Sequence, residues 1–185
     1  MERKDLNILA NQYASTIKSM IKDNARFYYP DTVINWRFGY DEDASIVAAC
    51  NRKDNIITIN LKSVKESFSN KDTKTIEYFL LHEIRHIFQH EIIKKHQNGI
   101  EIELDTEIVE KWIYESTHYV KSKNENGDEN PDYFNQDSEM DAYAYSYAVM
   151  KYKYKTVDLY VPPVYGDEFY NIVNMWIDLF TSEKL

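Results

Sequence analysis

The chain has 185 residues and a mass of 22.1 kDa, a length that predicts one domain with room for a full hydrophobic core. Hydrophobic residues make up 43% and charged residues 29%, with only 4 Gly and 4 Pro, which excludes collagen-like, low-complexity and wholly disordered classes. The formal charge of −9 argues against binding to a phosphate backbone, so we expect no nucleic-acid partner.

The cysteine count and the hydropathy pattern indicate a compartment. Cys50 is the only cysteine, which excludes an intramolecular disulfide and leaves a cysteine-based metal site without ligands. The sequence shows no signal-peptide pattern and no apolar run of membrane-spanning length. We therefore expect a protein of the reducing cytoplasm that does not contact a membrane.

The first third of the chain predicts one helix and three strands. Apolar residues recur at helical spacing from Leu6 to Ile21, after Asp5 as N-cap, and this pattern ends near Ala25. Residues 32–40, 45–50 and 56–61 are rich in β-branched, aromatic or alternating apolar residues, which is typical of strands. Short polar connections between them favour hairpins and an antiparallel meander.

The rest of the chain predicts four helices. The first and longest runs from residue 72 or 73 to about 96 and closes at Asn98-Gly99. The others cover about 105–120, 138–154 and 167–182, with a polar, turn-rich loop at 121–135. The fold class predicted is α+β, in a single domain over 1–185 with a core at about 32–150 and a helical C-terminal extension at about 155–185.

The long helix carries His82-Glu83-Ile84-Arg85-His86, an HExxH sequence. A spacing of four places both imidazoles on one helix face, about one turn apart, so that two nitrogens can bind one Zn²⁺ at about 2.0–2.1 Å. Glu83 need not bind zinc, but can take a proton from a zinc-bound water and pass it to a leaving amine. This combination is typical of a metal-dependent hydrolase.

HExxH also occurs by chance, and the alternative is a polar stripe on a partly exposed helix. The flanking residues Phe79, Leu80, Leu81, Ile84, Ile87 and Phe88 are apolar, however, and predict a buried helix. Buried histidines and a buried carboxylate are costly unless they are paired or bound to a metal. The context therefore favours zinc.

A catalytic zinc needs a third protein ligand. His90 lies about 12 Å along the helix axis from His82, too far to share one ion. The metzincin pattern requires a histidine six residues after His86, where this chain has Ile92. The third ligand must come from another part of the chain.

Two carboxylates are candidates for that ligand. Glu107 starts the helix at 105–120, which carries the bulky residues Trp112 and Ile113. Glu139 starts a later helix with alanines at positions 142, 144 and 148, which allow close packing against the zinc helix. We favour Glu139 on packing grounds, although its place near a helix N-terminus is also favourable for any carboxylate.

The motif HEIRHIFQH followed by EMDAYAYSYA resembles the gluzincin-type metallopeptidases, in particular small ImmA/IrrE-like and phage-encoded proteins, over about residues 32–150. The resemblance implies a zincin-like core with an N-terminal helix, a three-stranded antiparallel sheet, the HExxH helix and a downstream glutamate helix. It implies zinc held by His82, His86 and Glu139, with Glu83 as general base and acid. It also implies that residues 56–61 bind substrate peptide by adding it to the sheet edge.

The chain differs from the pattern of that family in several details. The 53 residues from His86 to Glu139 are a long insertion, and no DNA-binding region accompanies the core. Gluzincins often carry an Asp four residues after the ligand Glu, but here that position is Tyr143, and Asp141 lies two residues after Glu139. Four residues are unranked candidates for a donor to the developing oxyanion: His118, Tyr119, Tyr133 and Tyr143. Arg85 is expected to face solvent or a carboxylate.

The leading hypothesis is a cytoplasmic zinc metallopeptidase acting on a protein or peptide. The alternative is a zincin-like module without turnover, whose acidic surface and tyrosines between Tyr143 and Tyr170 bind a protein partner. The first hypothesis predicts a chain that binds zinc and hydrolyses its substrate, whereas the alternative predicts a chain that binds zinc without hydrolysis.

Overall fold

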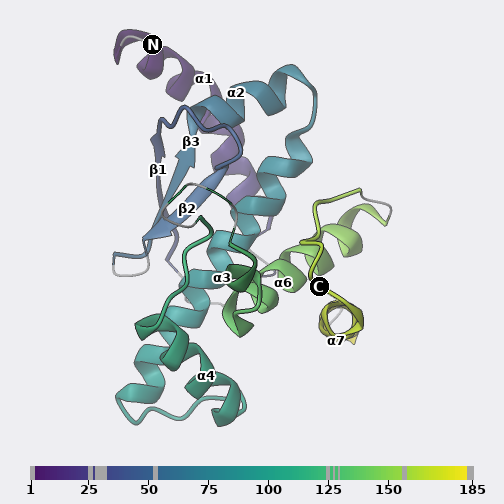
Figure 1. The fold of residues 1–185 in the computed structure, drawn as a ribbon. Coiled ribbons are helices and arrows are strands. Elements are labelled where there is room, and N and C mark those ends of the chain that lie inside the picture. Colours follow the sequence, from purple (N-terminus) through teal and green to yellow (C-terminus); the bar gives the residue numbers. More distant parts are fainter. Residues whose placement is uncertain are drawn as a thin grey trace. The chain divides into compact units, whose positions relative to one another are not determined.

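A computed structural model of the chain describes residues 3–24, 27, 33–51, 54–123, 126, 128, 130–155 and 158–182. The protein is α+β, as predicted. Its elements (Figure 1) are α1 (Arg3–Asp23), β1 (Asn35–Gly39), β2 (Ala48–Asn51), β3 (Ile56–Asn60), α2 (Leu61–Ser69), α3 (Thr73–Gln97), α4 (Thr106–Thr117), α5 (Pro131–Phe134), α6 (Asp137–Tyr154) and α7 (Asp167–Ser182). The chain divides into two compact units, with the boundary inside α3 after Ile87. The single domain over 1–185 stays a prediction.

The three strands form one mixed sheet in the order β1-β3-β2. β3 pairs with β1 in parallel and with β2 in the antiparallel sense. The predicted antiparallel meander is therefore wrong, because the chain after β1 crosses to the far side of β3. Ile57 and Ile59 of β3 are 0% and 1% exposed. The central position of the sheet stabilises the most apolar strand most, because this strand is covered best there.

The position of β3 also corrects a second expectation. Residues 56–61 were expected to take a substrate peptide at the sheet edge, but β3 is paired on both sides. Its backbone groups are already used in the two ladders, so no further strand can add to it. The outer edges of this sheet belong to β1 and β2.

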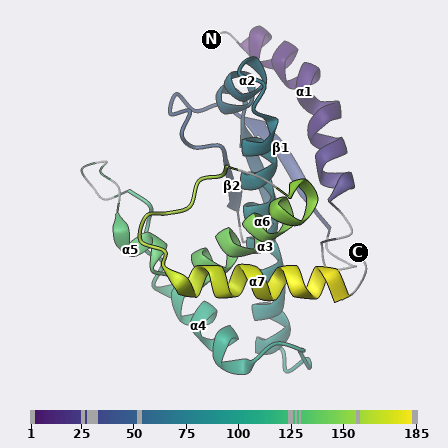
Figure 2. The ribbon, with the colours of Figure 1, turned by 90° about the vertical axis from the view of Figure 1, so that its right-hand side faces the viewer.

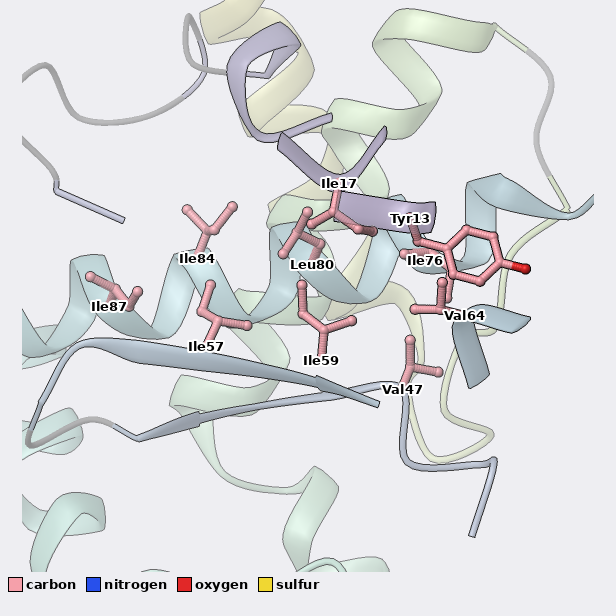
Figure 3. Packing of buried hydrophobic residues seen from close by; sticks show 10 residues of the cluster. All are labelled: Tyr13, Ile17, Val47, Ile57, Ile59, Val64, Ile76, Leu80, Ile84 and Ile87. Atoms are coloured by element: carbon pink, nitrogen blue, oxygen red, sulfur yellow. The ribbon is translucent and has the colours of Figure 1, made fainter. Parts of the chain in front are cut away.

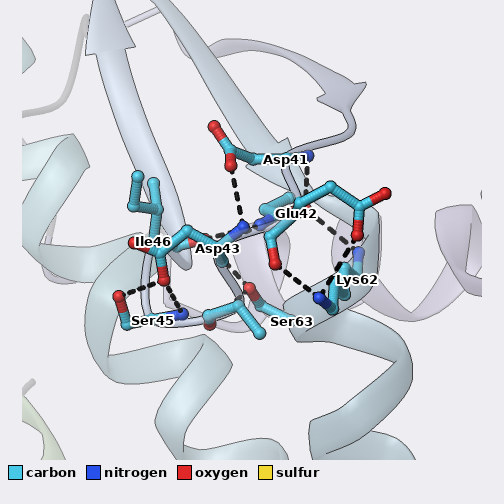
Figure 4. A network of polar contacts seen from close by, with 9 residues as sticks. Asp41, Glu42, Asp43, Ser45, Ile46, Lys62 and Ser63 are labelled. Atoms are coloured by element: carbon cyan, nitrogen blue, oxygen red, sulfur yellow. Dashed lines mark hydrogen bonds and ion pairs between the residues drawn. The ribbon is translucent and has the colours of Figure 1, made fainter.

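The crossing between β1 and β2 is held by side chains at the start of α2 (Figure 4). Asn60, the N-cap of α2, donates its side-chain amide to the carbonyl oxygens of Asp43 and Ile46. Ser63 donates its hydroxyl to the same Ile46 carbonyl at 2.9 Å. Lys62 donates to the carbonyl oxygen of Glu42. These bonds satisfy loop carbonyls and fix the crossover against the helix.

The sequence reading missed α2. The alternating strand pattern of residues 56–61 continues into Leu61, which in the structure is the first residue of the helix. Leu61 and Val64 are buried at i and i+3, the spacing of a helix face. The Asn60 cap is the local signal for this helix start, since its side chain accepts a hydrogen bond from the Lys62 amide at 3.1 Å.

The core of the first unit lies between the sheet and its helices (Figure 3). α3 contributes Ile76, Leu80, Ile84 and Ile87, spaced along one face. The other members come from α1, α2, β3 and the loop before β2: Tyr13, Ile17, Val47, Ile57, Ile59 and Val64. The same helix that carries HExxH is thereby a principal core element of this unit.

The second unit is helical, and in it α6 packs against both α4 and α7 (Figure 2). The helices predicted at 105–120, 138–154 and 167–182 are confirmed, and α5 is a single turn within the predicted loop. One small core joins the end of α3 to α4 through Ile92, Ile93, Val109 and Trp112. Among the described residues, none of the helices is both long and apolar enough to cross a membrane.

Candidate metal site

HExxH lies in the middle of α3, whose two ends are defined by local signals. At the start, the Asp72 carboxylate accepts hydrogen bonds from the Thr75 amide and hydroxyl at 3.3 and 2.6 Å. At the end, Gly99 takes a positive φ of 69° and its amide donates to the His96 carbonyl. The motif therefore occupies a stable helix interior, as predicted.

The two motif histidines meet on one face of α3. Their Nε2 atoms are 3.0 Å apart, and their rings are perpendicular, with centroids 4.6 Å apart and an interplanar angle of 89°. His82 is 2% exposed and His86 is 4% exposed. Two polar nitrogens thus point toward a single place in a buried environment.

This geometry fits a divalent metal of the zinc type. Two Nε2 atoms that bind one zinc at about 2.0–2.1 Å with tetrahedral angles lie about 3.3 Å apart. The separation of 3.0 Å between His82 and His86 is close to this value. In the metal-free chain one neutral imidazole can donate to the other across this distance.

Further polar side chains of α3 are buried. Glu83 is 8% exposed, Arg85 5% and Gln89 4%. Of the two surroundings expected for Arg85, solvent and a carboxylate, its burial excludes solvent. A carboxylate such as Glu83 that is removed from bulk water has a stronger interaction with nearby charges.

Glu139 lies in the first turn of α6 and is 0% exposed. Each of its oxygens accepts a hydrogen bond from a tyrosine. Tyr133 donates its hydroxyl to Oε2 at 2.6 Å, and Tyr119 donates to Oε1 at 3.2 Å. The buried carboxylate is therefore fixed in orientation by two neutral donors.

Tyr133 is a permanent donor in this arrangement. Burial, and next the negative charge of Glu139, raise the pKa of its hydroxyl far above the usual range of tyrosine. A phenol that keeps its proton at all working pH values donates to the carboxylate throughout.

The start of α6 is positioned by a residue of α4. Glu115 accepts hydrogen bonds from the amides of Asp137 and Ser138 at 2.6 and 2.9 Å. These amides have no partner within the helix, so a carboxylate from another element acts as their cap and also interacts favourably with the helix dipole. The turn that carries Glu139 is thereby tied to α4.

Gln136 fixes the segment before α6. Its side-chain oxygen accepts from the Val120 amide at 3.0 Å, and its side-chain nitrogen donates to the carbonyl oxygens of Val120 and Tyr133 at 3.1 and 3.0 Å. One buried amide thus binds the backbone of Val120, the residue after Tyr119, and the backbone of Tyr133.

The remaining sequence candidates lie elsewhere. Glu107 is exposed at the start of α4, where its amide donates to Asp105. His118 is exposed and stacked on Tyr114. Tyr143 belongs to an aromatic cluster with Phe134, Tyr160 and Tyr165. Of the four unranked donor candidates, Tyr119 and Tyr133 donate their hydroxyls to Glu139.

Gln89 joins the C-terminal part of α3 to α6, within the second unit. Its side-chain nitrogen donates to the Ser138 carbonyl and to Asp141 Oδ2, each at 2.8 Å. The sequence reading missed this residue and the cap by Glu115. The signal for Gln89 was available, because residues 82, 86 and 89 follow i, i+4, i+7 along one helix face.

Comparison of the chain with protein-family models, with curated proteins and with solved structures finds no match. The features of the chain that indicate a function are accordingly the histidine pair of α3, Glu139 and the residues bound to them.

Proposed function

We propose that the protein is a zinc-dependent metallopeptidase in which His82, His86 and Glu139 hold the metal. The observation that carries this proposal is the buried histidine pair, whose Nε2 atoms face each other at 3.0 Å on adjacent turns of α3. Two imidazole nitrogens and one carboxylate oxygen form the ligand set of many catalytic zinc sites, which leave the fourth position open. All three side chains are buried and each offers one ligand atom.

The third ligand follows from the continuity of α3. Gln89 binds the carbonyl of Ser138, the residue before Glu139, and His86 lies three residues earlier on the same helix. Three residues span about 4.5 Å of helix axis and return to nearly the same face. The start of α6 therefore supplies the carboxylate, whereas Glu107 is exposed on α4.

The chemistry of the site follows from its donor set. When bound, zinc supplies a Lewis acid that polarises a carbonyl group and lowers the pKa of water. Glu83, buried and adjacent in sequence to His82, is the group that accepts the proton from the attacking water and transfers it to the leaving amine. The resemblance of the two motifs to gluzincin-type, ImmA/IrrE-like peptidases supports the same roles.

The substrate in this proposal is a peptide segment of a protein. An extended peptide can add to a sheet only at an open edge, and in this sheet those edges are β1 and β2. The lone cysteine, Cys50, suits a reducing compartment such as the cytoplasm. A restricted protein substrate is more consistent with that compartment than general digestion.

Elemental analysis of the purified chain and its variants tests the metal site. We expect about one zinc per wild-type chain, and loss of zinc in His82→Ala and in Glu139→Ala. His90→Ala is the matched control, because His90 is on the same helix about 12 Å from His82 and is expected to leave zinc content unchanged. A wild type without zinc after zinc is supplied, or a Glu139→Ala variant that keeps it, contradicts the proposal.

The variant Glu83→Gln separates metal binding from turnover. We expect it to bind zinc as the wild type does and to lose cleavage of a random-sequence peptide mixture, read by mass spectrometry. Normal cleavage by this variant would exclude Glu83 as the base. A wild type that binds zinc and cleaves no peptide would favour the module without turnover.

A further inference from the structure

The two tyrosines on Glu139 are unequal, and the difference bears on how the metal binds. The Tyr133 hydroxyl is 2.6 Å from Oε2, whereas the Tyr119 hydroxyl is 3.2 Å from Oε1. A hydrogen bond from a hydroxyl to a carboxylate is strongest near 2.5–2.7 Å, so the bond to Oε2 is the stronger one. This inference rests on the proposed role of Glu139 as a zinc ligand.

Tyr133 makes further contacts through its backbone and its ring. It lies in α5, and its carbonyl accepts from the Gln136 side chain at 3.0 Å. Its ring packs edge-on against Phe134, with centroids 5.0 Å apart and an interplanar angle of 73°. The first contact holds the backbone of Tyr133 and the second restricts its ring.

Tyr119 is held less firmly. It follows the end of α4, its side chain is 43% exposed, and its hydroxyl bond is the longer of the two. Its ring meets that of Tyr133 only at a centroid distance of 6.2 Å. Water is therefore an available partner for this hydroxyl when Oε1 is taken by another group.

We propose that Tyr133 positions Glu139 as a ligand through one oxygen, Oε1, and that the Tyr119 hydroxyl occupies this oxygen until a metal replaces it. Tyr133 is then a positioning residue that favours metal binding. Tyr119 competes with the metal for the same oxygen. The two hydroxyls contact one carboxylate and act in opposite directions on metal affinity.

Zinc affinity, measured by competition with a chromophoric chelator, tests this opposition. Tyr133→Phe is expected to weaken zinc binding about tenfold or more, the usual effect of removing a partner that orients a ligand. Tyr119→Phe is expected to strengthen zinc binding about three- to tenfold, because the metal no longer displaces a hydrogen bond. Tyr114→Phe, at a residue of α4 that is 63% exposed, is the matched control and is expected to bind as the wild type does.

The outcomes distinguish this inference from the proposed function. A wild type that binds no zinc, or a Glu139→Gln variant with unchanged affinity, overturns both. If Glu139→Gln loses zinc but the two tyrosine variants change affinity in the same direction, or not at all, the opposed roles are wrong and the zinc site stands. Melting of each variant in the presence of a chelator checks that it is folded.

A second measurement needs no folded variant of Tyr133. In wild-type protein labelled at the tyrosine Cζ carbon, the Tyr119 signal, assigned by its absence in Tyr119→Phe, is expected to shift when zinc is added, since its hydroxyl changes partner. The Tyr133 bond to Oε2 persists, so its signal should move less. An unchanged Tyr119 signal in zinc-loaded protein would contradict the exchange.

Discussion

Gln89 donates its side-chain amide to the carbonyl oxygen of Ser138 at 2.8 Å, and both residues are buried. The same nitrogen donates to Asp141 Oδ2 at 2.8 Å. One amide therefore fixes α6 to the C-terminal part of α3 on both sides of Glu139. Within the second unit, this contact places the first turn of α6, which carries Glu139, against the C-terminal part of α3.

Replacing Gln89 by Leu is expected to weaken the protein and its metal site together. The change keeps the size of the side chain and leaves the Ser138 carbonyl and the Asp141 carboxylate without this donor, at a cost of about 1–3 kcal/mol. Zinc affinity should fall about tenfold or more, because Glu139 is less firmly placed. Urea unfolding and chelator competition measure the two effects.

Gln97→Leu is the matched control for this change. Gln97 is exposed on the last turn of the same helix, so we expect both quantities to stay near the wild-type values. If Gln89→Leu unfolds at the wild-type urea concentration and keeps its zinc affinity, the contact does not position α6.

Glu115→Ala is expected to destabilise the start of α6. The amides of Asp137 and Ser138 lose their acceptor, which typically costs about 1–2 kcal/mol at a helix N-terminus. Glu110→Ala, also on α4, removes an acid with a side chain 59% exposed and paired to His96, and such surface pairs contribute little. Thermal unfolding of both variants checks this, and equal losses would exclude a special role for Glu115.

The sequence predicted those parts of the site that depend on spacing within one helix. His82 and His86 are four residues apart, and the helix period alone places their rings on one face. The ends of α3 were also readable, because Asn98-Gly99 is a local stop signal. The ends of a helix and the spacing of side chains along it depend on residues that are close in the chain. Both can therefore be predicted from the sequence alone.

The mixed sheet and the contacts of Glu139 were not readable in this way. Strand order depends on which strand is stabilised most by a central position in the sheet. The polar residues around Asp41 and Asp43 are compatible with a hairpin and with a crossover equally. The tyrosine bonds join residues 6 and 20 positions from Glu139. Such contacts are set by tertiary packing, and a cluster of tyrosines does not show which hydroxyl meets which acid.

Alkaline pH is expected to destabilise the protein partly through Tyr147. Burial, and next the proximity of Tyr170 and Asp158, raise the pKa of its hydroxyl in the folded state. The folded protein therefore holds this proton more tightly than the unfolded chain. This contribution is fully present below the unfolded pKa of about 10 and is lost as pH rises through the folded value.

The urea midpoint of the wild type should thus fall more steeply above about pH 10 than that of Tyr147→Phe, which lacks the ionising group. Tyr114→Phe, with its ring 63% exposed, should follow the wild-type slope. Identical slopes for wild type and Tyr147→Phe would show that this hydroxyl does not contribute.

Gly39 of β1 and Thr58 of β3 are diagonal neighbours on adjacent strands, since the register pairs Gly39 with Asn60 and Thr58 with Arg37. A Cβ atom on Gly39 would lie 2.6 Å from Thr58 Cγ2. Thr58 is restricted because its side chain is β-branched and its hydroxyl accepts from Arg37 Nε at 3.1 Å. The methyl group of Thr58 therefore fills the space that glycine leaves open.

Gly39→Ala is accordingly expected to destabilise the protein by about 1–3 kcal/mol, the usual cost of overpacking. Thr58→Ser removes the Cγ2 methyl group and keeps the hydroxyl for Arg37, so Gly39→Ala should cost much less in the Thr58→Ser background. A double-mutant cycle by urea unfolding measures this coupling, which we expect to be about 0.5 kcal/mol or more. If Gly39→Ala costs the same in both backgrounds, the two positions are independent and the close approach of β1 to β3 has another cause.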